Sequence, residues 1–157
     1  SLCYKKLNMS KKDLSVLKIK ENSLKNKSTL IYSNFKSYLE KFIKKKPFLV
    51  AVSGGPDSLA LTALSQVYSR EKKNKIFFVL IDHGIRLNSY KEAITVKSLF
   101  KKKKINLTIL KNKKKINKNI QGQARDVRYK LLLNFCNKHQ IKFILTGHHR
   151  DDQIETF

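Results

Sequence analysis

Short apolar runs alternate with amphipathic stretches along most of the chain. Four apolar runs are typical of buried strands because they are short and end in polar or glycine-containing turns; they cover residues 48–52, 76–81, 105–110 and 141–146. Apolar residues at steps of three and four predict helices over 29–44, 57–69, 90–103 and 120–138. A last helix is expected to begin near Asp151.

The same spacing predicts which face of each helix is buried. In the first helix the apolar residues recur at steps of four, three and four. The predicted buried residues, helix by helix, are Ile31, Phe35, Tyr38 and Phe42; Leu61, Leu64 and Tyr68; Ala93, Val96, Leu99 and Phe100; and Ala124, Val127, Leu131 and Phe135.

Strands that alternate with helices predict parallel βαβ units with right-handed crossovers. The expected fold is therefore an α/β domain, Rossmann-like, with a parallel sheet covered by helices on both faces. Ligands of such sheets bind at the carboxyl ends of the strands. Here those ends carry polar segments at residues 53–55, 82–84 and 147–149. This coincidence predicts an active site at one edge of the sheet.

The chain is organised as a short arm and one domain. Residues 1–28 are rich in Lys, Ser and Asn and are expected to be a basic, flexible arm, while residues 29–157 form the domain. Because Phe157 lies inside the last predicted helix, the domain is expected to be truncated there. No apolar run has the length of a membrane span, so a cytoplasmic location is expected, with an organellar one left open if the arm is a targeting segment.

The charge is strongly positive. Lys and Arg number 35 against 11 Asp and Glu, which gives a net charge of +24. Such a charge favours polyanionic partners such as nucleic acid. The alternative is that the lysines are solvated and reflect a biased composition. Two cysteines, Cys3 and Cys136, lie far apart and have no metal-ligand spacing.

The segment after the first predicted strand has the chemistry of a phosphate-binding loop. It consists of Ser53, Gly54, Gly55, Pro56, Asp57 and Ser58. Two glycines let backbone N–H groups approach an anion, and the following helix directs its positive end to the same place. The two serine hydroxyls are further donors, and Asp57 is a candidate Mg²⁺ ligand. The hexapeptide resembles the Ser-Gly-Gly-x-Asp-Ser loop of the N-type ATP pyrophosphatases, which split ATP between its α and β phosphates.

Three further segments are polar and follow in order. Asp82, His83 and Gly84 end the second strand, where a simple capping Asp is the alternative reading. Arg125 and Arg128 lie one helical turn apart and suit phosphate, but a surface Arg-Asp-Arg ladder is the slightly favoured interpretation of this segment taken alone. Residues 147–156 contain two His and two Asp, typical of a metal cluster, but Asp152 and Glu155 would also give an acidic helix face that holds an ammonium group.

Together these segments resemble the tRNA(Ile)-lysidine synthetase family over residues 45–157. The resemblance lies in Asp-His-Gly-Ile-Arg at 82–86, in Asn-Ile-Gln-Gly-Gln-Ala-Arg-Asp-Val-Arg-Tyr at 119–129, and in His-His-Arg-Asp-Asp-Gln-Ile-Glu-Thr at 148–156. Leu87 stands where the family usually has Pro.

The resemblance implies an enzyme that uses ATP and Mg²⁺ to join L-lysine to C2 of the wobble cytidine of tRNA(Ile) with a CAU anticodon. The base would be adenylated on O2, with release of pyrophosphate, before the lysine amine displaces AMP. It implies that the 53–58 loop and His83 contact the nucleotide and that Asp57 holds the metal. It also implies that Arg125 or Arg128 steadies charge at the reacting phosphate. His148 would handle a proton, and Asp152 and Glu155 would orient lysine.

The sequence leaves three alternative functions open. One is a different tRNA-modifying enzyme with the same loop, such as a thiolase, which would need paired cysteines. Another is a small-molecule ligase or amidotransferase, against which the basic charge argues. A third is a non-catalytic fragment that binds tRNA and ATP. The oligomeric state is undetermined, and a homodimer is left open.

Overall fold

The structure is a computed structural model that describes residues 5–8, 21–84, 88–112 and 120–147. The elements, in chain order, are β1 (Lys5–Asn8), α1 (Glu21–Phe42), β2 (Phe48–Val52), α2 (Pro56–Lys72), β3 (Ile76–Asp82), α3 (Ser89–Lys102), β4 (Leu107–Lys111), α4 (Ile120–Lys138) and β5 (Phe143–Thr146). Within these residues no helix is both long and apolar enough to cross a bilayer. The helix predicted near Asp151 lies outside them.

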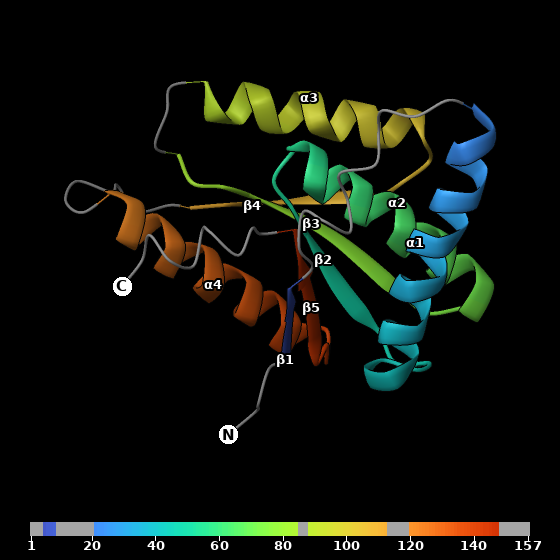
Figure 1. The fold of residues 1–157 in the computed structure, drawn as a ribbon. Coiled ribbons are helices and arrows are strands. Elements are labelled where there is room, and N and C mark those ends of the chain that lie inside the picture. Colours follow the sequence, from blue (N-terminus) through green and yellow to red (C-terminus); the bar gives the residue numbers. More distant parts are fainter. Residues whose placement is uncertain (1–4, 9–20, 85–87, 113–119, 148–157) are drawn as a thin grey trace.

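A single parallel sheet runs through the domain (Figure 1). Its strand order is β1-β5-β2-β3-β4, and every neighbouring pair is parallel. Val50, in the central strand, lies opposite Leu145 on one side and Phe78 on the other. The parallel α/β architecture predicted from the sequence is confirmed.

The edge strand β1 was not predicted. It lies within residues 1–28, which the composition predicts as a flexible arm, and it pairs with β5 from Lys5–Phe143 to Asn8–Thr146. Its sequence, Lys-Lys-Leu-Asn, has no apolar alternation. Such a strand depends on backbone hydrogen bonds to a neighbour already in place, and these leave no trace in side-chain pattern. Helix α1 likewise begins at Glu21, before the predicted start at residue 29.

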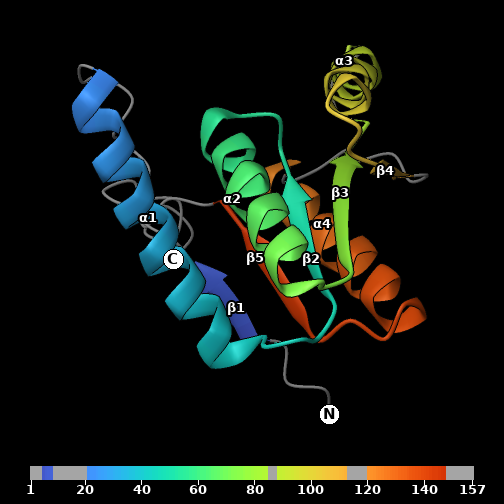
Figure 2. The same ribbon diagram turned by 90° about the vertical axis from the view of Figure 1, so that its right-hand side faces the viewer.

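Helices cover both faces of the sheet (Figure 2). One core cluster joins α1, α2 and α3 to one face, and the other joins α4 to the opposite face. In the first cluster the Tyr68 ring packs edge-on against Phe35 and Phe48, with centroid separations of 6.4 and 6.2 Å. In the second, Leu132 and Cys136 of α4 are fully buried.

In α2 the predicted Leu61 and Tyr68 are buried and Leu64 is partly buried against the same cluster, whereas the faces predicted for the other helices need correction. In α1, Phe35 is buried as expected, but Tyr38 is 44% exposed and the buried positions are Leu39 and Ile43. The helical spacing predicted Tyr38 and not Leu39 because apolar residues occupy both adjacent positions. Only packing against α2 decides which of the two is buried.

The same correction applies to α3 and α4. Leu99 is 51% exposed, whereas Ala93 and Phe100 of the same helix are buried. In α4 the fully buried residues are Leu132 and Cys136, one position beyond the predicted Leu131 and Phe135, which are only partly buried. Consecutive leucines at residues 131–133 leave the helical phase undetermined by sequence alone.

The turns after α1, α2, α3 and α4 share one backbone feature. Each contains a non-glycine residue with positive φ, namely Lys44 (52°), Lys73 (57°), Lys104 (57°) and Gln140 (54°). Helices commonly end on a left-handed residue, but glycine usually occupies that place because a Cβ atom is strained there. The four turns therefore each carry a local cost of about 1 kcal/mol.

Candidate active site at the carboxyl edge of the sheet

The loop between β2 and α2 has a shape that requires glycine at one position. Gly54 has a φ of +83°, and a Cβ atom there would lie 3.0 Å from Cγ2 of Val96 in α3. Both the backbone angle and the contact exclude larger residues. Gly55 has an ordinary φ of −74° and serves as the N-cap of α2. The first glycine thus shapes the turn, and the second leaves the helix end uncovered.

Ser58 holds this loop together from inside. Its hydroxyl donates to the carbonyl of Gly55 at 2.9 Å and accepts from the backbone N–H of Ser53 at 3.2 Å. The residue is 1% exposed. The sequence suggested that this hydroxyl donates to a phosphate, but in the structure its proton goes to the loop. Ser53 is exposed and retains its hydroxyl at the surface.

The N-terminus of α2 is open to an anion. No side chain caps it, because the N-cap is Gly55 and Pro56 follows at the first helical position. The first N–H groups of a helix have no partner within the helix, and its dipole favours negative charge there. Asp57 is the acidic residue of this first turn and is partly exposed. Phosphate oxygens and one carboxylate are a common environment for Mg²⁺.

Asp82, at the end of β3, is a structural residue. It is 6% exposed, and its Oδ1 accepts from the backbone N–H of Gly84 at 3.1 Å and from the hydroxyl of Ser89 at 2.8 Å. The carboxylate therefore joins the strand end to the start of α3. Asn112, after β4, donates its backbone N–H to the Asp82 carbonyl at 2.9 Å. These bonds fix the backbone that presents His83.

His83 meets Arg128 at this edge, although their helix and strand lie in different layers. The Nη2 of Arg128 is 3.4 Å from Nε2 of His83. A guanidinium can only donate, so Nε2 accepts and the proton of the neutral ring resides on Nδ1. Burial, followed by the positive charge of Arg128, lowers the pKa of His83 below its ordinary value, while Asp82 opposes this. The ring is accordingly neutral at pH 7.

The Nδ1 atom of His83 is buried and has no hydrogen-bond partner among the described residues. A buried donor without a partner costs free energy, and a ligand that accepts from it removes that cost. His83 therefore carries a buried Nδ1 whose hydrogen bond is not supplied by any described residue. The alternative reading of this segment, a strand end with a capping Asp, accounts for Asp82 but not for His83.

Arg125, one turn before Arg128, has a different neighbour. Its guanidinium carbon lies 5.9 Å from the centroid of the Tyr129 ring on the same helix. Both arginines are partly buried. The structure thus places Arg128 at the strand ends and gives Arg125 an aromatic contact along α4, so the two residues differ in what they touch.

The end of β5 lies directly against the phosphate-binding loop. A Cβ atom at Gly147 would lie 3.1 Å from both the carbonyl carbon of Asp57 and the backbone nitrogen of Ser58. The segment expected to bind lysine therefore leaves the sheet beside the first turn of α2. His148, Asp152 and Glu155 themselves lie outside the described residues.

The sequence motifs predicted the loop, His83 and Arg128 as site residues, and they did not include three residues that contact the loop, α2 or the His83 backbone. Val96 faces Gly54, Asn112 holds the His83 loop through its side-chain nitrogen, 3.3 Å from the His83 carbonyl, and Gly147 packs on α2. Asn112 follows a predicted strand, so its position at the edge was readable from sequence. The contacts of Val96 and Gly147 depend on packing between distant segments. Among the described residues, no group of three His, Cys, Asp or Glu side chains could hold a metal by itself.

A glycine loop that opens a helix N-terminus at the carboxyl edge of a parallel sheet defines a nucleotide-binding α/β domain. The chain belongs to the PP-loop domain family, whose model matches residues 27–157. Membership implies that the domain uses ATP. The fold resembles that of the U34-tRNA thiolase NcsA from Methanococcus maripaludis, with a TM-score of 0.59 and 17% identity, covering 74% of this chain and 45% of that one.

Three similar curated proteins are tRNA(Ile)-lysidine synthases. The tRNA(Ile)-lysidine synthase of Orientia tsutsugamushi is 42% identical over 128 residues, covering 79% of this chain and 29% of the relative. That of Wolbachia pipientis wMel is 42% identical over 111 residues, covering 69% and 26%. That of Rickettsia prowazekii is 31% identical over 134 residues, covering 82% and 31%. The chain thus spans less than a third of the length of these relatives, and the resemblance noted in its motifs is confirmed.

Proposed function

We propose that this chain is the ATP-binding domain of an enzyme that joins lysine to C2 of the wobble cytidine of tRNA(Ile). The observation that supports this most is the uncapped N-terminus of α2 behind the Gly54–Gly55 turn, at the same edge of the sheet as His83, whose Nδ1 has no hydrogen-bond partner among the described residues. The relatives named as tRNA(Ile)-lysidine synthases support the substrate class.

The phosphate-binding loop fits the β and γ phosphates of ATP. Backbone N–H groups at the start of α2 would hold their oxygens, and the helix dipole would favour the negative charge. Asp57 would hold the Mg²⁺, and the bound cation would supply positive charge that stabilises the departing pyrophosphate. Ser58 would act indirectly, because its hydroxyl fixes the carbonyl of Gly55. The loop thus supplies binding and charge stabilisation for the first half of the reaction.

His83 and Arg128 would act on the same nucleotide from the neighbouring strand. The reaction breaks the bond between the α and β phosphates, while O2 of the cytidine becomes attached to the α phosphorus. A guanidinium and a neutral imidazole N–H at the strand ends are suitable donors for oxygens that gain charge in this step. Arg128 would serve in this role more directly than Arg125, whose neighbour is Tyr129.

The second half of the reaction joins the lysine ε-amine to C2 and releases AMP. We assign the lysine site to Asp152 and Glu155 and the proton transfer to His148, on the strength of the sequence motif. Gly147, the residue before this motif, lies against Asp57, which is consistent with a lysine site beside the phosphate loop. The cytidine must leave its stack to reach either site.

Single-turnover assays with ATP, tRNA(Ile) and lysine supplied separately and together test the proposal. Pyrophosphate release is expected only with ATP and the CAU-anticodon tRNA, and lysidine only when lysine is added. Asp57→Asn should reduce the rate of pyrophosphate release by about 10²-fold or more and weaken the magnesium dependence of ATP binding. Asp126→Asn, an equal charge change at an exposed position on α4, is the control.

The outcomes separate the proposal from its alternative. If ATP and tRNA bind but no pyrophosphate is released under any combination, the chain is a binding fragment and not a catalyst. If ATP shows no magnesium-dependent affinity and Asp57→Asn changes nothing, the assignment of the loop is wrong.

A further inference from the structure

Exposed lysines gather at the amino edge of the sheet, opposite the candidate site. The loops that lead into β2, β3, β4 and β5 contain no Asp or Glu. Their exposed lysines are Lys44, Lys45, Lys46, Lys73, Lys75, Lys103, Lys104 and Lys142. We call this set the lysine edge. None of its ammonium groups forms an ion pair with a described carboxylate.

The carboxylates nearby in sequence are already paired. Glu71, in the last turn of α2, accepts from Lys36 and from the hydroxyl of Tyr32. Glu40, near the end of α1, is 2.5 Å from Lys72. These pairs connect α1 to α2. Glu40 and Glu71 therefore do not neutralise the lysine edge. A dense, uncompensated set of cations raises the local potential and attracts a polyanion.

The strand register sets these lysines in a row. Phe48 lies opposite Ile76, Leu49 opposite Ile144, and Phe78 opposite Leu107. Neighbouring parallel strands are about 4.8 Å apart, so four strands spread the row over about 14 Å. Phosphates along one strand of a nucleic acid are spaced by about 3.4 Å along its axis. The row therefore matches several consecutive phosphates.

Buried hydrogen bonds hold the loop before β2 in a fixed shape. Asn74, 6% exposed, donates through Nδ2 to the carbonyls of Lys44 and Lys46, both at 2.8 Å. The Tyr68 hydroxyl adds a bond to the Lys44 carbonyl at 3.2 Å, and Ser69 fixes Asn74 by donating to its carbonyl at 2.6 Å. The backbone that carries these lysines is thus ordered before any partner binds, which lowers the entropic cost of binding.

Lysine also occupies positions where glycine would be less strained. Lys44, Lys73 and Lys104 all have left-handed φ values. Two simpler explanations exist for these lysines. A cation at the carboxyl end of a helix is stabilised by the helix dipole. A lysine-rich composition also places lysines at such positions by chance. Neither explanation requires the three charges to act together, whereas a polyanion-binding surface does. The difference is testable, because only a polyanion-binding surface predicts that removing the three charges together lowers affinity for RNA.

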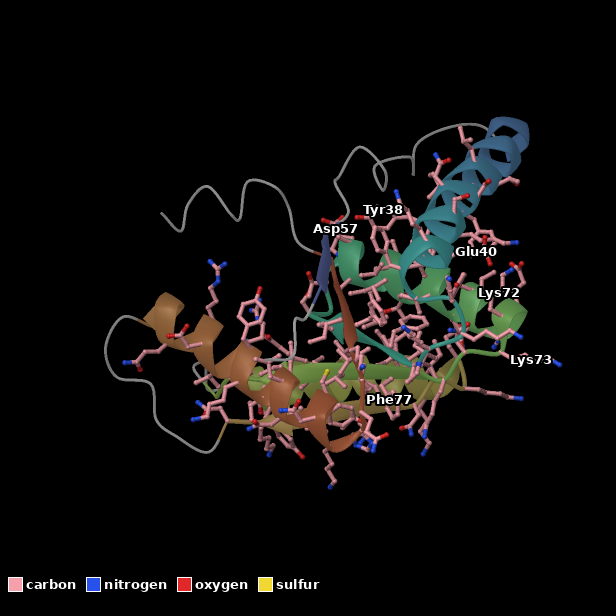
Figure 3. All side chains as sticks on the ribbon, turned by 90° about the horizontal axis from the view of Figure 1, so that it is seen from below. Tyr38, Glu40, Asp57, Lys72, Lys73 and Phe77 are labelled. Carbon is pink, nitrogen blue, oxygen red and sulfur yellow. The ribbon has the colours of Figure 1, made fainter. Side chains whose placement is uncertain are left out.

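We propose that the lysine edge binds the phosphate backbone of an RNA as a second contact surface, separate from the catalytic edge. Figure 3 shows Asp57 and Lys73 at opposite ends of α2, with Lys73 directed outward. Strand β3, from Ile76 to Asp82, separates the two edges by about 20 Å, so ATP bound at one edge does not reach the other. A folded RNA does span that distance. That this RNA is a tRNA rests on the proposed function; the phosphate contact does not.

The test variant removes three positive charges of the lysine edge and preserves the left-handed backbone of the turns that carry them. In the variant Lys44→Asn, Lys73→Asn and Lys104→Asn, each new residue is neutral and tolerates left-handed φ better than lysine. The slope of log Kd for tRNA against log salt concentration should decrease by about 2 to 3. The affinity for tRNA at low salt should fall about tenfold or more. The melting temperature should stay the same or rise, and magnesium-dependent ATP affinity should not change.

A control variant removes the same charge elsewhere. Lys91→Gln, Lys97→Gln and Lys130→Gln lie at exposed positions on α3 and α4. They should change the salt dependence less than the Asn variant does. Equal effects in both variants, or no effect of the Asn variant, would overturn the proposal. If the chain forms no lysidine but the two variants still differ in RNA binding, the proposed activity fails and the lysine edge stands.

Discussion

Gly147 packs against the backbone of Asp57. A Cβ atom at position 147 would lie only 3.1 Å from the carbonyl carbon of Asp57. The contact joins the end of β5 to the first turn of α2. Because β5 lies beside β2 in the sheet, the phosphate-binding loop and Gly147, the last described residue after β5, follow neighbouring strands and lie against each other. Several consequences of this arrangement are open to measurement.

Gly147→Ala should displace the first turn of α2. The new methyl group meets backbone atoms of Asp57 and Ser58, which cannot rotate away. Overpacking of this kind typically costs about 1–3 kcal/mol. We expect weaker ATP binding and a lower melting temperature, measured by titration calorimetry and thermal denaturation. Unchanged values for both would show that the loop adapts freely.

Gly54 and Gly55 should respond differently to alanine. Gly54→Ala places a Cβ on a residue with φ +83° and 3.0 Å from Val96, whereas Gly55→Ala meets only the Ser53 hydroxyl at 3.6 Å. The first change is expected to destabilise the fold by about 1–3 kcal/mol and to abolish tight ATP binding. The second should leave stability nearly unchanged. Chemical denaturation of both variants makes the comparison, and equal losses would contradict the geometry.

His83 should titrate below pH 6.5, and Arg128 should help to keep it there. Burial is the main cause of its lowered pKa and the Arg128 charge is the next. Arg128→Gln removes that charge, so the pKa of His83 should rise toward its ordinary value. An NMR titration of the imidazole resonances in both proteins measures this. A fall, or no change, would mean that the 3.4 Å contact is not formed in solution.

The same shift predicts how stability depends on pH. Since the folded pKa of His83 is lowered, the unfolded chain binds the proton more readily, and the contribution of the neutral ring to stability is fully present above about pH 6.5. It is lost as the pH falls from 6.5 toward the folded value. His83→Asn should therefore lose less stability than the native chain when the pH is lowered from 7.5 to 5.5, as measured by urea denaturation.

Gln140→Gly should stabilise the protein. Gln140 has a φ of 54° in the turn between α4 and β5 and is exposed. Glycine removes the strain of the left-handed backbone, partly offset by its greater freedom in the unfolded chain. The expected net gain in the free energy of unfolding is a fraction of about 1 kcal/mol. A loss of stability on denaturation would mean that the Gln140 side chain contributes more than its backbone strain costs.

The sequence by itself determined the order of elements and the edge where the chemistry lies. Apolar runs such as 48–52 and 76–81 are buried wherever they pair, and parallel strands bring their carboxyl ends together, so the loop at 53–58 and His83 were expected at the same edge of the sheet. The glycine pair and the following helix start carry the phosphate-binding chemistry in local backbone geometry, which sequence encodes directly.

Tertiary structure decided what depends on contacts between distant segments. Polar β1 became a strand only because β5 offered a free edge, and Leu99 and Tyr38 face solvent because their helices turned other residues toward the sheet. The pairing of Arg128 with His83, the fit of Gly147 on α2 and the row of lysines at the far edge follow from register and layer packing. Such relationships join residues far apart in the chain, and no local pattern of side chains records them.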